Sequence, residues 1–226
     1  ILFDYYEEKK ISTKITKFKN VEDVVSCKVQ KQYEHNPYPR WKTLGLVTSH
    51  SIKEIVSEAS IKLYDKNIEN ILSPKILVAG CGTGQHPLMT AKRFKNSEIV
   101  AVDLSLGSLS YAKRKTQEYG QENIKYIQAD LLNLSELKQK FDIVESAGVL
   151  HHMNVPLDGW KELVKCLKVG GLMKIGLYSK LARQHITEIR KENKKLNIDS
   201  DDSTIKLFRN KIFNSDCDYH KKLLVS

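Results

Sequence analysis

Short apolar runs alternate with amphipathic stretches through the middle of the chain, from Pro74 to Tyr178. The alternation predicts strands followed by helices of matching length. Such units form right-handed βαβ crossovers, so we expect an α/β fold: a Rossmann-like, doubly wound, mostly parallel sheet with helices on both faces. Ser105 is expected to cap the second of the helices. The predicted strands are 75–79, 97–102, 124–128, 141–145 and 172–178, and the predicted helices are 85–95, 106–119, 135–139 and 157–167.

Helical patterns also flank this core. Two helices are expected over residues 21–34 and 49–67, separated by a segment, 35–41, in which two prolines exclude a helix. After Tyr178 the pattern is helical and very polar to about Phe213, and residues 214–226 give no clear strand. We therefore divide the chain into an N-terminal helical segment with a proline-rich strap (1–73), a ligand-binding core (74–179) and a helical C-terminal part (180–226).

The charge balance changes this picture little. The formal net charge is +10, but only six of the 37 basic residues are Arg, and the lysines are spread along the helices. This distribution favours a solvated surface over a dedicated nucleic-acid interface. No apolar run is long enough to span a membrane, and residues 1–20 do not resemble a secretory signal. Widely spaced cysteines predict reduced thiols in a cytoplasmic protein; they are Cys27, Cys81, Cys166 and Cys217.

A glycine-rich turn, Gly80 to Gly84, follows the first predicted strand and precedes a helix. In a doubly wound sheet this is the place where the ligand binds. The spacing is G-x-G-x-G, whereas a dinucleotide fingerprint would need its third glycine at Gln85, and no Walker A lysine is present. The spacing of the loop therefore indicates a ligand that is a nucleoside with a small zwitterionic tail. It argues against a dinucleotide-dependent oxidoreductase.

Two carboxylates follow the next two strands. Asp103 ends the second strand, where a carboxylate accepts hydrogen bonds from ribose hydroxyls; the alternative is that it stabilises the N-terminus of the next helix. Asp130 ends the third strand, where it can accept the exocyclic amine of adenine or satisfy a local turn.

Taken in order, these motifs resemble those of the class I S-adenosylmethionine-dependent methyltransferases over about residues 74 to 178. Gly80 to Gly84 is similar to their first motif, and Ala129-Asp130 is similar to the third. The remaining matches are Asp103-Leu104-Ser105 with Leu109 and Ala112, Phe141 to Val144 leading to Val149-Leu150-His151-His152-Met153, and Leu167 to Gly171, where Val169 replaces a usual proline.

The resemblance implies S-adenosylmethionine as cofactor and S-adenosylhomocysteine as product, with direct in-line methyl transfer to an acceptor. It assigns the cofactor to Ala79, Gly80, Cys81, Gly82, Thr83, Gly84, Gln85, Asp103, Leu104, Ala129, Asp130, Leu131 and Ser146.

A general base is needed only if the acceptor is protonated. His151 and His152 are the candidates, with Glu145 and Tyr33 behind them; the alternatives are a structural turn for the histidines and a packed, hydrogen-bonded acid for Glu145. No third ligand accompanies the histidines at a recognisable spacing, so no metal is expected.

The segment from Gln32 to Trp41 resembles the Q-Y-E-x-N-P-Y-P-R-W stretch of a bacterial subgroup, some of whose members carry tetratricopeptide repeats. Its large side chains form either a lid over the cofactor or acceptor, or a strap that packs the N-terminal helices onto the sheet. They are Tyr33, Tyr38, Arg40 and Trp41. The family fold has seven strands, the last two forming a hairpin, and only five are legible here. We therefore expect a truncated chain in which residues 180–213 are a helical insertion.

The predicted function is methyl transfer to a small-molecule or lipid-like acceptor. The alternatives are methylation of protein or RNA, for which the basic charge is the support, and a nonenzymatic S-adenosylmethionine-binding module. Nothing in the sequence indicates the acceptor atom or the oligomeric state.

Overall fold

The computed structural model describes residues 2–179, 181–195 and 202–225. The chain divides into two compact units between Leu177 and Tyr178. The first unit contains the sheet and everything that precedes it, and the second is helical. Each unit is described by itself.

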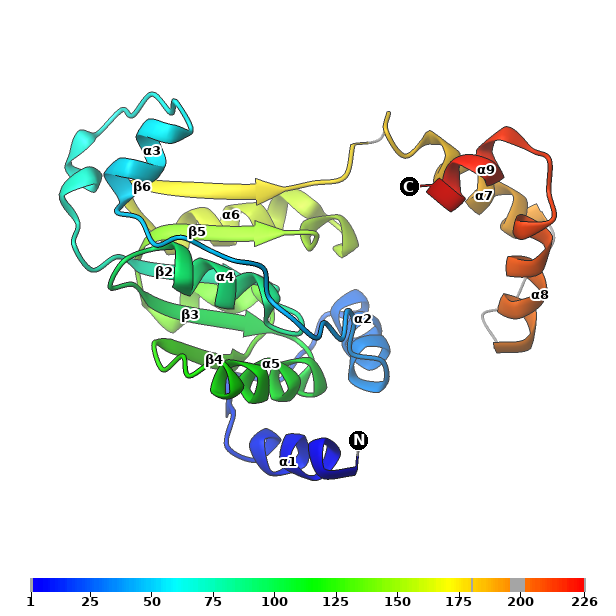
Figure 1. Ribbon diagram of the computed structural model, residues 1–226, viewed down its shortest axis with the longest axis horizontal. Coiled ribbons are helices and arrows are strands. Elements are labelled where there is room, and N and C mark those ends of the chain that lie inside the picture. Colours follow the sequence, from blue (N-terminus) through cyan, green and yellow to red (C-terminus); the bar gives the residue numbers. More distant parts are fainter. Residues whose placement is uncertain (1, 180, 196–201, 226) are drawn as a thin grey trace. The chain divides into compact units, whose positions relative to one another are not determined.

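A six-stranded sheet forms the centre of the first unit (Figure 1). Its order is β1-β4-β3-β2-β5-β6, and all five neighbouring pairs are parallel. This confirms the predicted Rossmann-like fold. The strand order reverses beside β2, which is where doubly wound sheets bind their ligands. The strands are β1 (Thr16–Lys17), β2 (Lys75–Ala79), β3 (Glu98–Asp103), β4 (Ile124–Gln128), β5 (Phe141–Ala147) and β6 (Leu167–Gly176).

Helices cover both faces of this sheet. Successive side chains of β2 point alternately into the two cores on either side. Ile76 and Val78 pack into one core with α3, α4 and α5, whereas Leu77 and Ala79 pack into another with η2 and α6. The helices of the first unit are α1 (Leu2–Ser12), α2 (Val24–His35), α3 (Ile52–Glu58), η1 (Lys66–Asn70), α4 (Gln85–Arg93), α5 (Leu106–Glu118), η2 (Leu131–Leu137), η3 (Leu150–His152) and α6 (Pro156–Cys166).

The five predicted strands and the helices between them are present, and most of their ends agree within two residues. Two boundaries differ more: β6 begins at Leu167 rather than at residue 172, and the helix expected over 135–139 is the 3-10 helix η2, which begins at Leu131. In the first unit, α1, the short 3-10 helices η1 and η3, and the short strand β1, which pairs with the outer edge of β4, were not predicted. No strand lies along the outer edge of β6 among the described residues, so the hairpin of the family fold is not part of the described sheet.

The prediction of one helix over residues 49–67 is wrong. Helix α3 ends after Glu58 because Ser60 adopts the left-handed conformation, with φ of 53°. Ile61 N–H then donates to the Val56 carbonyl at 3.1 Å, which is the bond of a Schellman cap. Glycine is the usual residue at that position, so serine gave no signal of a helix end.

The second unit consists of α7 (Gln184–Lys195), α8 (Asp202–Phe213) and α9 (Asp218–Val225). Its helical character was predicted, although α9 was not. The Glu192 carboxylate on α7 joins the three helices, because it accepts hydrogen bonds from Lys211 at 2.5 Å and His220 at 2.9 Å. Among the described residues of either unit, no helix combines the length and the apolar character needed to cross a membrane.

Candidate functional site

The glycine loop leaves β2 at Ala79 and enters α4 at Gln85. The N–H groups of Gly80 and Cys81 both donate to the Val102 carbonyl, at 2.8 and 2.9 Å, so the loop starts against β3. Gly84 has φ of 87°, and a Cβ there would lie 2.5 Å from the Cβ of Ala112. Gly84 therefore permits the close approach of the loop to α5. A Cβ on Gly82 would meet nothing closer than the Tyr38 carbonyl at 3.9 Å, so this glycine faces open space.

The Asp103 carboxylate lies at the tip of this loop. Its Oδ2 accepts the Gly82 N–H at 2.8 Å, and its Oδ1 accepts the Ser105 N–H at 3.0 Å. Burial raises the pKa of Asp103 above its ordinary value, and these backbone donors only partly offset that rise. Ser105, as predicted, caps α5 by accepting the Ser108 N–H at 3.0 Å. The carboxylate has more lone pairs than these backbone donors occupy, so it can also accept a ligand hydroxyl.

The residues after β3 and β4 line the same edge of the sheet. The Leu104 carbonyl accepts side-chain amides of Gln30 at 3.0 Å and Gln128 at 2.8 Å, which fixes α2 beside the end of β3 (Figure 1). Ala129 N–H donates to the Asp103 carbonyl at 3.0 Å. Asp130 is buried and caps η2, which begins at Leu131, by accepting the Leu132 N–H at 3.0 Å. Asp130 thus makes the local backbone hydrogen bond that the sequence analysis gave as the alternative to binding adenine.

Glu145 and Ser146 are neighbours near the end of β5 and are both buried. Ser146 Oγ meets no hydrogen-bond partner among the described residues. Glu145 Oε2, in contrast, accepts Thr90 Oγ1 at 2.5 Å and lies 3.0 Å from His86 Nε2, and Oε1 lies 3.9 Å from Lys174 Nζ. Burial raises the pKa of Glu145, but His86, Thr90 and Lys174 outweigh it and the pKa falls below its ordinary value.

His86 was missed by the sequence analysis. It stands in the first turn of α4, four positions before Thr90, and this spacing places the two side chains on one face of the helix. That spacing was the available signal, but nothing local connects it with a carboxylate on another strand. Glu145 therefore has the surroundings of a packed, hydrogen-bonded acid.

The loop after β5 brings the two histidines towards α2. The rings of His151 and His152 lie 4.2 Å apart between centroids, and Tyr33 on α2 meets His152 edge-on at 6.4 Å. Residues more than a hundred positions apart thus converge where the strands end. Tyr33 is the one residue of the proline-rich segment whose ring contacts this loop among the described contacts.

Residues 36–41, which we call the strap, cross the glycine loop. Trp41 is buried and its Nε1 donates to the Thr83 carbonyl at 2.9 Å, while Thr83 Oγ1 donates to the Pro39 carbonyl at 2.5 Å. Arg40 binds Glu8 on α1 at 2.8 Å. Tyr38 is 74% exposed. The four large side chains therefore do not gather at one point: Trp41 and Arg40 pack the strap, and Tyr33 lies at the strand ends.

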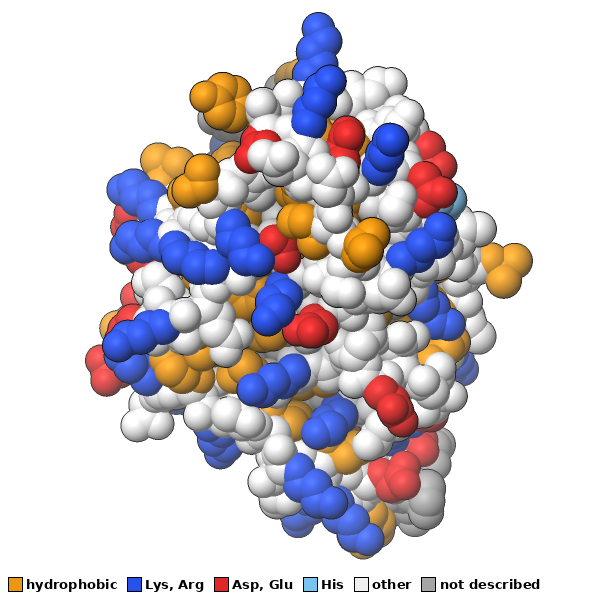
Figure 2. All heavy atoms as spheres, turned by 90° about the vertical axis from the view of Figure 1, so that its left-hand side faces the viewer, with side chains coloured by type: hydrophobic (Ala, Val, Ile, Leu, Met, Phe, Trp, Pro, Cys, Tyr) orange, Lys and Arg blue, Asp and Glu red, His pale blue; other side chains and the backbone are white. Residues whose placement is uncertain are grey.

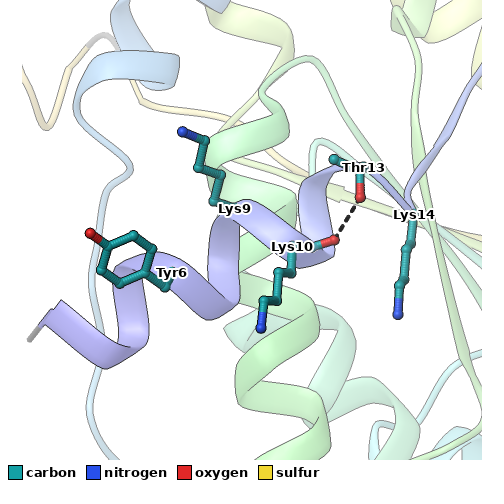
Figure 3. A pocket seen from close by; sticks show the side chains of 5 residues that line it. All are labelled: Tyr6, Lys9, Lys10, Thr13 and Lys14. Carbon is teal, nitrogen blue, oxygen red and sulfur yellow. Dashed lines mark hydrogen bonds between the residues drawn. The ribbon is translucent and has the colours of Figure 1, made fainter.

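A separate hollow of about 360 Å³ lies on α1 and the turn after it (Figure 3). Its lining residues are Tyr6, Lys9, Lys10, Thr13 and Lys14, none of which belongs to the glycine loop or the strand ends. The three lysines form no ion pair with any described residue. Among all the residues that the structure describes, no group of three or more His, Cys, Asp or Glu side chains is arranged to hold a metal ion.

Comparison with known sequences identifies the core. Residues 76–171 match the family model described as a methyltransferase domain. The chain is 35% identical over 118 residues to an uncharacterized protein of Synechococcus sp., covering 52% of this chain and 28% of that protein. It is 30% identical over 118 residues to a malonyl-[acyl-carrier protein] O-methyltransferase of Priestia megaterium, covering 52% and 39%. It is also 30% identical over 125 residues to a ribosomal RNA small subunit methyltransferase C of Haemophilus influenzae, covering 54% and 35%.

The matches thus span between about a quarter and two fifths of the length of these relatives. Among solved structures, PKMT2 from Rickettsia typhi superimposes with a TM-score of 0.50 at 21% identity, over 66% of this chain and 30% of that one. This likeness shows a shared fold. Residues 76–171 therefore match a methyltransferase domain, and the sheet that they contribute to has the Rossmann-like fold.

Proposed function

We propose that the protein transfers a methyl group from S-adenosylmethionine to a small-molecule acceptor. The observation that carries the proposal is the Asp103 carboxylate, which is fixed to the Gly82 N–H at 2.8 Å, at the glycine of the loop where an added Cβ would meet nothing closer than 3.9 Å. Ser146 adds a buried hydroxyl without a described partner near the end of β5. Polar groups of this kind are costly to bury unless a ligand satisfies them.

The residues present fit this cofactor. Asp103 would hold the ribose hydroxyls, Ala129 to Leu131 would border the adenine, and the backbone of the glycine loop would approach the methionine portion. The bound cofactor supplies a methyl group that is already activated on its sulfonium. The chain's own task is to position the acceptor in line and to exclude water. The strap over Thr83 and helix α2 beside Leu104 are placed to do so.

The acceptor would lie between Tyr33 and the loop after β5. If the acceptor carries a proton at its nucleophilic atom, His151 or His152 would receive it. Glu145 is occupied by His86 and Thr90, and we therefore assign it to the support of α4 rather than to the acceptor.

On the face at which the strands begin, several basic side chains have acidic partners. Figure 2 shows the face at which the strands begin, the left side of Figure 1, with lysine and arginine side chains scattered among acidic and uncharged ones. Several of the basic side chains at the starts of strands have acidic partners, as Lys168 does with Asp142 at 2.8 Å. The positive charge on this face is thus partly neutralised by acidic neighbours.

Titration calorimetry with S-adenosylmethionine tests the proposal on the wild type and on Asp103→Ala. We expect saturable binding by the wild type and binding weakened by about ten- to a hundredfold in the variant, because a charge-assisted pair is lost. Asp142→Ala is the matched control: this aspartate is also buried, but it lies at the start of β5, where it accepts the Lys75 N–H at 2.9 Å. Its affinity for the cofactor should equal that of the wild type. A folded wild type that does not bind the cofactor would exclude the proposed function.

Methylation of a protein or RNA is the second candidate, and it is favoured by the three lysines of α1 and the turn after it, which form no ion pair with any described residue (Figure 3). Transfer of a labelled methyl group from the cofactor into fractionated cell extract separates the two. Label in the small-molecule fraction, unaffected by salt, supports the first candidate. Label in macromolecules that falls steeply as salt rises supports the second.

A further inference from the structure

Glu8, on α1, is the centre of an ion-pair cluster that lies outside the proposed site. Its Oε1 accepts Arg40 Nη2 at 2.8 Å from the strap, and Nε and Nη2 of Arg114 on α5, each at 3.1 Å. The Glu8 side chain is only 12% exposed. Screening by water is therefore weak toward Arg114, which is 10% exposed, and stronger toward Arg40, which is 49% exposed, and the charge of Glu8 acts on both guanidinium groups.

Without Glu8 the two arginines would repel each other. Both guanidinium groups lie over the ring of Tyr111, at 4.6 Å for Arg40 and 5.2 Å for Arg114. Arg114 keeps Asp4 and Glu118 as further acidic partners, whereas Glu8 is the one acidic partner of Arg40 among the described ion pairs. Loss of the Glu8 charge would therefore act mainly on Arg40 and push the strap away from α5.

The strap transmits this contact to the glycine loop. Arg40 precedes Trp41, whose carbonyl accepts the Tyr111 hydroxyl and whose Nε1 donates to the Thr83 carbonyl at 2.9 Å. Thr83 is buried within the loop and donates back to Pro39. A continuous series of contacts thus runs from α1 through the strap to the residue between Gly82 and Gly84.

We propose that Glu8 is a positioning residue for the cofactor: by holding Arg40, it keeps the strap seated on the glycine loop and so sets the affinity for S-adenosylmethionine. The inference rests on the proposed function, since it concerns the same loop. It assigns a role in cofactor binding to a helix that lies outside the matched methyltransferase domain.

A double-mutant cycle with Glu8→Gln and Arg40→Gln tests the proposal by cofactor calorimetry. We expect each single variant to bind S-adenosylmethionine about three- to tenfold more weakly, which is the range for coupling between charged groups that touch. In the Arg40→Gln background, Glu8→Gln should have no further effect, because the repulsion that it exposes is gone. Asp4→Asn is the matched control, since Asp4 is on the same helix and pairs with Arg114 at 3.9 Å but not with Arg40 in the described ion pairs.

Amide hydrogen exchange at residues 82–84, without cofactor, provides a second measurement. Exchange should become faster in Glu8→Gln and stay at the wild-type rate in Asp4→Asn. Unchanged exchange and unchanged affinity in Glu8→Gln would overturn the inference, as would losses that simply add in the double variant. If the wild type and all variants fail to bind the cofactor, the proposed function fails instead, and the exchange rates still decide whether Glu8 holds the loop.

Discussion

The ends of β3 and β5, which flank β2 on either side, each carry an acid, and the two acids are held in different ways. Asp103 on β3 has backbone N–H partners, from Gly82 and Ser105, whereas Glu145 on β5 has side-chain partners, above all His86 and Thr90. Burial raises the pKa of Asp103, whereas at Glu145 the partners outweigh burial and lower the pKa. A carboxylate held by backbone donors keeps lone pairs for a ligand, whereas a carboxylate surrounded by side-chain partners makes its hydrogen bonds within the protein. The two acids therefore differ in their partners and in their burial, since Glu145 is buried and Asp103 is half-buried.

The largest expected effect comes from Asp103→Asn. Both partners of this carboxylate are donors, so the new amide would set its NH₂ group against the N–H of either Gly82 or Ser105. Leaving a buried donor unpaired should lower the free energy of unfolding by about 2–3 kcal/mol. Urea denaturation measures this change. Wild-type stability in the variant would mean that the backbone donors do not hold this acid.

Glu145→Gln should have a smaller effect. His86 and Thr90 both bond to the same oxygen, Oε2, so a glutamine carbonyl placed there can accept both. The loss of charge opposite Lys174 and His86 should cost about 1 kcal/mol of unfolding free energy, again by urea denaturation. Affinity for S-adenosylmethionine should not change. A loss larger than that of Asp103→Asn would invert the comparison between the two strand ends.

The two acids also differ in how far the sequence could predict their surroundings. The loop and Asp103 were recognisable because the carboxylate follows the glycines by about twenty residues at the end of the adjacent strand, and its partners are backbone groups that any sequence provides. Glu145 depends on His86, which is 59 positions away, and no periodicity reports a contact at that distance. The strands of the core were predictable because their apolar runs are buried on both faces.

Elements held by tertiary contacts escaped prediction. Helix α1 carries a mixed Tyr-Tyr-Glu-Glu-Lys-Lys run without a clear apolar face, and its ion pairs with Arg40 and Arg114 form only after folding. Strand β1 has two exposed residues and no alternation to detect. The strap was predicted as an interruption of the helices, but the sequence could not show that Trp41 would be bound to Thr83.

The smallest expected effect is on the pH dependence of stability. The folded-state pKa of Glu145 lies below its ordinary 4.5, so its contribution is fully present above that pH and is lost as the pH falls further. The folded-state pKa of Asp103 lies above its ordinary 3.8, so acidification through that pKa relieves a cost and stabilises the fold.

The quantity to measure is the loss of unfolding free energy between neutral pH and about pH 3. Relative to the wild type, this loss should become smaller in one variant and larger in the other. Glu145→Gln should reduce the acid-induced loss by about 1 kcal/mol or less, and Asp103→Asn should make it steeper by a similar amount. Parallel profiles for the two variants would show that their surroundings do not differ electrostatically.

Strand β1 also has a consequence for how copies of this protein behave together. Without it, β4 would be the outermost strand on that side and would offer unpaired backbone groups to any neighbouring chain. Thr16 and Lys17 lie against Ile127 and Gln128, and Phe18 N–H donates to the Gln128 carbonyl at 2.8 Å, so the groups at the carboxyl end of β4 are occupied. The new edge strand is two residues long and carries Lys17. Short, charged edge strands discourage edge-to-edge pairing with another chain. A segment that no hydrophobic pattern marks as a strand thus protects one side of the sheet from self-association.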